Sequence, residues 1–220
     1  MKHEPIYYGD YLQLDKILDA QDCKSKQAGN EAHDETLFIV IHQTYELWFK
    51  QIIHEINSID DMFNTERVKP TDLGTINHRL NRVVEIQRVL NDQLNIIETM
   101  TPLDFMDFRD YLVPASGFQS IQFRMIELKL GLRQQHRLGI DREFFNSRLR
   151  QDDKDFLTEM EKDATLLELI DAWLCRMPFA NTEHYNFWEK YQEAINKMLD
   201  EDKAIIEKNT TLHPKEREFE

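Results

Sequence analysis

Glycine, proline and cysteine are all scarce in this sequence, whose 220 residues include six glycines, six prolines and two cysteines. Because glycine and proline interrupt regular structure, their scarcity favours long helices over many short strands. The two cysteines, Cys23 and Cys175, are too few for a disulfide framework or a cysteine-based metal site. We therefore expect a protein of a reducing compartment, the cytoplasm.

Positive charge is also in deficit, with 27 lysines and arginines against 41 aspartates and glutamates and a net charge of -14. This imbalance argues against nucleic acid or an anionic membrane surface as the main partner. No apolar run approaches the roughly 18 residues of a membrane span, and the N-terminus holds no apolar signal segment. We expect neither nucleic acid nor a membrane as a partner.

Several catalytic motifs are absent as well. A di-iron bundle needs Glu-x-x-His on two helices, and none of the eight histidines has a glutamate three residues before it. His54-Glu55 lacks the second histidine of a HExxH zinc site, and there is no P-loop, GxGxxG or GxSxG motif. Any catalysis must come from a bound cofactor or from dispersed single residues.

What is present is helical periodicity, with no alternating run long enough for a sheet. The fold class predicted is all-α, a bundle of long helices in a single domain over 1–208, with an N-terminal arm at about 1–20. Residues 21–32 read as a loop, 133–164 as one or two charged surface helices, and 209–220 as a loose polar tail. The other helices are predicted at 6–20, 33–56, 72–100, after Thr101, 118–132, 166–175 and 186–208.

The segment 33–56 is apolar on two sides, which is typical of a central helix. Asp34 can cap it. One stripe comprises Phe38, His42, Tyr45, Phe49, Ile52 and Ile56. His42 is its one ionisable group, and two interpretations stay open. It is either a core histidine satisfied by backbone or by Tyr45, or a hydrogen-bonding or proton-accepting group in an apolar pocket.

A second group of candidates follows Thr101, where Pro102 and Asp104 indicate a helix start. Arg109 either pairs with Asp107 or Asp110, or lays its aliphatic stem on apolar surface with the charge in solvent, or receives a substrate carboxylate among aromatic rings.

Ser116-Gly117 is either a plain turn or a presenter of hydroxyl and N–H groups to a ligand. Tyr8 and Tyr11 are either packing residues or part of an arm that docks on a partner subunit.

Taken together, four stretches resemble the haem-dependent tryptophan 2,3-dioxygenase family over about residues 7–200. They are YGDYLQLDKIL, HDETLFIVIHQTYELWFKQI, LDFMDFRDYLVPASGFQSIQFRMIE and TLLELIDAWL. The resemblance implies an all-helical bundle of the tryptophan/indoleamine dioxygenase type. It also implies a homotetramer with N-terminal arm exchange, haem b as cofactor, and oxidation of L-tryptophan by O2 to N-formylkynurenine.

The resemblance also implies roles for individual residues. His42 matches the histidine that binds the indole N–H and is the expected catalytic residue, and Arg109 matches the arginine that binds the substrate carboxylate. Ser116, with Gly117 beside it, matches the serine near the haem. Tyr8 and Tyr11 match tyrosines that a neighbouring subunit contributes. The remaining substrate-binding positions implied are Phe38, Ile39, Val40, Ile41, Phe105 and Leu112.

The sequence departs from the family pattern after these stretches. Neither the histidine that ligates haem iron nor the family's GTGGSSG-like loop is present, and no axial ligand is assigned. The expectation is therefore a truncated or split dioxygenase. The alternatives are a haem-free module that binds indoles or assembles the oligomer, and another haem-linked reaction on an indole.

Overall fold

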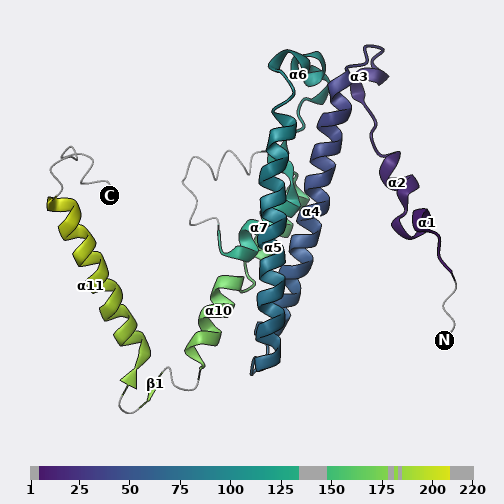
Figure 1. Cartoon of the computed structure of the whole chain (residues 1–220). Helices are drawn as coiled ribbons and strands as arrows, with labels where there is room; N and C mark the ends of the chain where they lie inside the picture. Colours follow the sequence, from purple (N-terminus) through teal and green to yellow (C-terminus); the bar gives the residue numbers. More distant parts are fainter. Residues whose placement is uncertain (1–4, 134–147, 178–180, 183–184, 209–220) are drawn as a thin grey trace. The chain divides into compact units, whose positions relative to one another are not determined.

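The computed structural model describes residues 5–133, 148–177, 181–182 and 185–208 (Figure 1). The chain divides into two compact units, Met1–Leu169 and Ile170–Glu220. The expectation of one domain over 1–208 stays a prediction. The expected loose tail at 209–220 lies outside the described residues.

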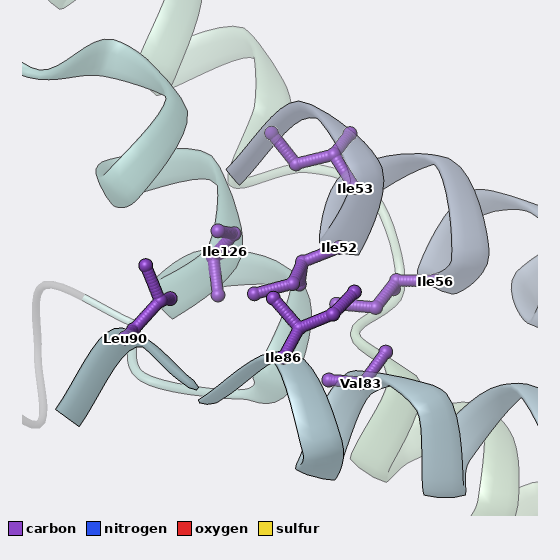
Figure 2. Close-up of a cluster of buried hydrophobic side chains, with 7 residues drawn as sticks. All are labelled: Ile52, Ile53, Ile56, Val83, Ile86, Leu90 and Ile126. Carbon is purple, nitrogen blue, oxygen red and sulfur yellow. The ribbon is translucent and has the colours of Figure 1, made fainter. Parts of the chain in front are cut away.

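The first unit is built around α4 (His33–Phe63), which packs against α5 (Pro70–Ile97) and α7 (Ile121–Leu130). Figure 2 shows Ile52 of α4, Ile86 of α5 and Ile126 of α7 converging in one cluster. Ile56 is 0% exposed and Ile52 1%. Burying a side chain of this size contributes about 1.5–3 kcal/mol, so the three helices are held mainly by their isoleucines.

The central helix is confirmed, and it runs seven residues past the predicted end at 56, because Ile59 and Phe63 continue its buried stripe. The predicted cap is wrong. Ala32 occupies the N-cap position without a side-chain hydrogen bond, and Asp34 lies inside the first turn. The carboxylate that forms hydrogen bonds at this end of α4 is that of Glu35.

The chain before α4 is more broken than its sequence suggests. The helix expected over 6–20 is two short helices, α1 (Tyr8–Leu12) and α2 (Leu14–Leu18). Gln13 between them has φ of 51°, in the left-handed region that a continuous α-helix excludes. The expected loop 21–32 contains a one-turn helix, α3 (Lys24–Gln27).

After α5, the predicted helix start at Thr101 is confirmed. The Thr101 hydroxyl accepts from the Asp104 N–H, while the Asp104 carboxylate accepts from the Thr101 hydroxyl and N–H. The Thr101 side-chain and backbone hydrogen bonds lower the pKa of Asp104. The helix α6 (Pro102–Arg109) passes into η1 (Asp110–Leu112), and η2 (Gly117–Gln119) precedes α7.

The remaining elements are α9 (Gln151–Met160), α10 (Leu166–Cys175), the strands β1 (Asn181–Thr182) and β2 (Tyr185–Asn186), and α11 (Phe187–Lys208). The two-residue strands form one antiparallel pair. The all-α fold class is confirmed, and α10 begins and ends at the predicted residues. In the described part of the chain, no helix combines the length and apolarity needed to cross a bilayer.

Candidate functional site

An open hollow of about 1520 Å³ lies beside the N-terminal half of α4. Its walls come from α3, α4, α5, α6, η1, the turn that follows η1, η2 and α7. Most of the predicted site residues line it: Phe38, Ile39, Ile41, His42, Phe105, Arg109, Leu112, Ser116 and Gly117. The fold thus gathers positions about 70 residues apart in sequence around one space.

His42 stands on the face of α4 that looks into this hollow. Its Nδ1 lies 2.7 Å from the carbonyl oxygen of Phe38, one turn earlier, and its ring lies 4.2 Å from the Phe38 ring. A carbonyl can only accept, so Nδ1 carries a proton, and in the neutral form of the ring the lone pair is on Nε2. The backbone therefore satisfies one ring nitrogen, and in the neutral form the other is left as an acceptor.

Tyr45 is not the partner of His42. Its hydroxyl donates to the backbone oxygen of Leu90 at 2.6 Å and joins α4 to α5. Burial raises the pKa of this phenol. Of the two hydrogen-bond partners expected for a core histidine at position 42, the backbone or Tyr45, His42 bonds to the backbone.

An aromatic cluster fixes α6 against α4. The ring of Phe38 lies 5.7 Å from that of Phe105 and 5.5 Å from that of Phe108. Phe105 and Phe108 meet edge to face at 5.3 Å, a favourable arrangement of ring quadrupoles. Phe108 is 0% exposed, and sequence reasoning did not place it at the site. Its burial seats the last turn of α6, which carries Arg109, beside the hollow.

Arg109 is exposed, and its Nη1 lies 4.0 Å from the sulfur of Met106. Within the described ranges it forms no ion pair with Asp107 or Asp110. The predicted local salt bridge of Arg109 is therefore not formed in this conformation. With no carboxylate partner in the part of the chain that the structure describes, this guanidinium at the edge of an apolar hollow is able to receive an anionic group.

Ser116 and Gly117 form a corner of the hollow. The Ser116 hydroxyl accepts from the N–H of Phe118 at 3.4 Å, and the Ser116 N–H donates to the side chain of Gln119 at 3.1 Å. These bonds cap η2, so the turn interpretation holds whatever else the corner does.

Three predicted residues are not brought to the hollow. Val40 is 42% exposed and lies on another side of α4, while Tyr8 and Tyr11 are 71% and 69% exposed. The predicted role of the tyrosines requires a neighbouring copy, which a single chain does not contain.

Sequence reasoning also missed residues that do line the hollow, among them Glu46, Phe49 and Phe123. Phe49 was on the predicted stripe with His42, so periodicity could have found it. Phe123, whose ring lies 5.5 Å from that of Phe49, comes from α7. The Gln122 side chain donates to the Glu46 carboxylate at 2.8 Å, a pairing across 76 residues that no local pattern indicates.

Comparison with known proteins gives one family. The family model of tryptophan 2,3-dioxygenase matches residues 2–220. A tryptophan 2,3-dioxygenase of Alteromonas mediterranea is 50% identical over 217 residues, and one of Bdellovibrio bacteriovorus is 44% identical over 217. In both comparisons 99% of this chain is covered, and the chain spans about 60% of the relative's length. A Dictyostelium discoideum tryptophan 2,3-dioxygenase is 47% identical over 207 residues, covering 94% of this chain and 52% of that protein.

Proposed function

Because this chain belongs to the tryptophan 2,3-dioxygenase family, we propose that its hollow binds L-tryptophan for oxidation by O2 to N-formylkynurenine. The observation that carries the proposal is the placement of His42 and Arg109, from two different helices, around one apolar hollow. An imidazole acceptor and a guanidinium among aromatic walls suit an amino acid with a large flat side chain.

Each residue then has a distinct task. Arg109 holds the substrate carboxylate through paired N–H groups. Nε2 of His42 accepts the indole N–H, because Nδ1 is already committed to the Phe38 carbonyl. Phe38, Phe105, Ile39, Ile41 and Leu112 enclose the ring and exclude water. Orientation and desolvation are what the chain itself contributes.

The family implies haem b, and the corner at Ser116-Gly117 fits one edge of such a group. A Cβ placed on Gly117 would meet no atom within 4 Å, so the corner opens onto free space. The hollow of about 1520 Å³ exceeds the roughly 300–1,000 Å³ of pockets for drug-sized ligands, which leaves room for a macrocycle beside the amino acid. Ser116 and Gly117 would hold the macrocycle edge. When bound, haem supplies the activation of O2.

The assembly proposed is a homotetramer in the cytoplasm with exchange of the N-terminal arm. Support for exchange comes from Tyr7, Tyr8 and Tyr11, which are all more than two-thirds exposed at 76%, 71% and 69%. Large aromatic side chains are enriched where subunits meet. Both cysteines are free, as is usual in a reducing compartment.

Replacing Arg109 by alanine tests the proposal. Hydrogen bonds to charged groups contribute roughly 1.5–3 kcal/mol, so Arg109→Ala should weaken L-tryptophan binding about 10- to 100-fold. Binding of indole, which has no carboxylate, should change less than about twofold. Isothermal titration calorimetry measures both. Arg88→Ala, which removes an exposed arginine of α5, is the matched control and should change neither. Equal losses for the two ligands would refute the carboxylate role.

The alternative is a haem-free module that binds indoles or assembles the oligomer. It is favoured by the lining of the hollow, where His42 is the one histidine among the described residues and its Nδ1 is occupied. Titration with haemin separates the two proposals. A sharp Soret band that shifts on adding L-tryptophan supports the dioxygenase, whereas the absorbance of free haemin supports the module.

A further inference from the structure

A buried carboxylate to which the proposed mechanism gives no task lies at the start of α4, among the residues that line the hollow. Glu35 is 0% exposed, and within the described residues no cation pairs with it. Burying an unpaired carboxylate is costly unless hydrogen bonds replace its water. The bonds that replace it therefore indicate what Glu35 is for.

Among the described residues, every donor to Glu35 belongs to the first turn of α3. The Lys24 N–H donates to Oε1 at 2.7 Å and the Ser25 N–H donates to Oε2 at 2.9 Å. The Ser25 hydroxyl also donates to Oε2, and its oxygen accepts from the Ala32 N–H at 3.0 Å. Ser25 is itself 0% exposed. These bonds lock α3 onto the start of α4.

A carboxylate is required for this pattern. Its two oxygens accept every one of these donors, whereas a glutamine amide has one accepting oxygen and would direct an NH₂ group at a backbone N–H. The Ser25 hydroxyl can accept from that NH₂ group through its second lone pair, but the N–H of either Lys24 or Ser25 is still left without an acceptor.

The contacts of α3 with other elements link the Glu35 hydrogen bonds to Arg109. The one-turn helix lies against α6 and η1, the elements that carry Arg109 and Leu112. Arg109 itself has no carboxylate partner in the described chain to hold it, so its position depends on the seating of α6. Support from a second layer of residues is what keeps a binding group in productive geometry.

We propose that Glu35 is a positioning residue for Arg109, acting through α3, which it fastens to α4 and which in turn supports α6 and η1. This inference rests on the proposed function, in which Arg109 binds the carboxylate of L-tryptophan. Loss of the Glu35 lock lets α6 shift, and a misplacement of about 1 Å can cost up to roughly 10²-fold at a site that demands orientation.

The test compares Glu35→Gln with Asp34→Asn. Both remove one negative charge from the first turn of α4, so any effect on the helix dipole is matched. Asp34 has no hydrogen bond to α3 in the described structure. Calorimetry with L-tryptophan and with tryptamine, which has the same ring and ammonium but no carboxylate, measures the consequence. Glu35→Gln should weaken L-tryptophan binding about tenfold and leave tryptamine within about twofold, while Asp34→Asn changes neither.

Hydrogen–deuterium exchange of the whole chain supplies a readout independent of ligand. In Glu35→Gln, peptides over 24–32 and 102–112 should exchange faster, while those over 76–90 stay as in the unaltered protein. Equal losses of both ligands, or unchanged exchange over 102–112, would overturn the positioning role. If the unaltered chain does not prefer L-tryptophan to tryptamine, the proposed function fails, and the exchange data still decide whether Glu35 seats α6.

A milder variant covers the case in which Glu35→Gln does not fold. Ser25→Ala removes one donor to Glu35 and the acceptor of Ala32 but keeps both backbone donors. It should change ligand binding and exchange in the same direction by a smaller factor. An effect confined to overall stability would contradict the proposal.

Discussion

At the scale of single residues, the state of His42 decides what the hollow recognises. The bond from Nδ1 to the Phe38 carbonyl fixes the tautomer, so Nε2 can only accept while the ring is neutral. A guest with an N–H donor is favoured over the same guest without one. The Phe38 carbonyl, one helical turn away, therefore determines which ring nitrogen of His42 can accept a hydrogen bond from a ligand.

The corresponding prediction concerns the indole N–H. His42→Ala should weaken L-tryptophan binding by about 3- to 10-fold, the range expected for one neutral hydrogen bond. 1-Methyl-L-tryptophan has no N–H to donate, so its affinity should change little. Calorimetry with the two ligands gives the comparison. His54→Ala, an exposed histidine of the same helix, is the control. A loss shared equally by both ligands would point to a cavity rather than to a hydrogen bond.

At the scale of helices, the seam between α4 and α5 holds a charged cluster beside the isoleucine core. Glu55 is 2% exposed and accepts from Arg82 and from Gln51, each at 2.7 Å. Burial alone would raise the pKa of Glu55, but the hydrogen bonds from Arg82 and Gln51 and the charge of Arg82 outweigh it, and the pKa is lowered.

This shift has a definite sign for stability. A carboxyl whose pKa falls on folding stabilises the protein above its ordinary value of 4.5, and that stabilisation is lost as pH falls through the lower folded value. Glu55→Gln should lower the free energy of unfolding at pH 7 by about 1–3 kcal/mol, since Arg82 stays half-exposed and can be rehydrated.

Urea unfolding between pH 3 and pH 7 measures the effect. The variant should show a shallower loss of stability in acid than the unaltered protein. Glu85→Gln, which removes an exposed glutamate paired with Arg88, should keep the full slope. The same slope in Glu55→Gln would contradict the assignment.

Helix by helix, the sequence predicts what local patterns determine. The apolar period locates α4, α5 and α11, and the Thr101-Pro102-Asp104 signal locates the start of α6. It does not predict α3, because Lys24–Gln27 has no apolar period and is stabilised by Glu35, ten residues further along. Nor does it predict the break at Gln13, where one residue adopts a left-handed conformation.

The candidate site, too, was predictable in part from the sequence. The roles of His42 and Arg109 came from the family resemblance, while their convergence depends on the contacts of Phe38 with Phe105 and Phe108, which only the fold provides. Residues such as Glu46 and Phe123, paired with partners far along the chain or on another helix, carry no sequence signal.

At the scale of the whole molecule, arm exchange predicts that two defective chains complement each other. His42→Ala chains keep their tyrosines, and chains with Tyr8→Ala and Tyr11→Ala keep His42. If the arm comes from a neighbour, random mixing by co-expression leaves about a quarter of the pockets with both parts intact. Calorimetry on the mixed protein should find high-affinity L-tryptophan sites that neither variant has alone. No recovery in mixed oligomers would show that the arm serves its own chain.

The central helix serves two purposes along one uninterrupted rod. Its N-terminal part, with Phe38, His42 and Phe49, borders the hollow, and its C-terminal part, with Ile52, Ile56 and Ile59, is buried in the core. Mutations of the core isoleucines weaken folding without touching the guest, whereas mutations of Phe38 or Phe49 change the hollow and the packing around α4 together. Natural selection can therefore adjust stability alone through the C-terminal part of this 31-residue element, whereas ligand choice and packing change together through its N-terminal part.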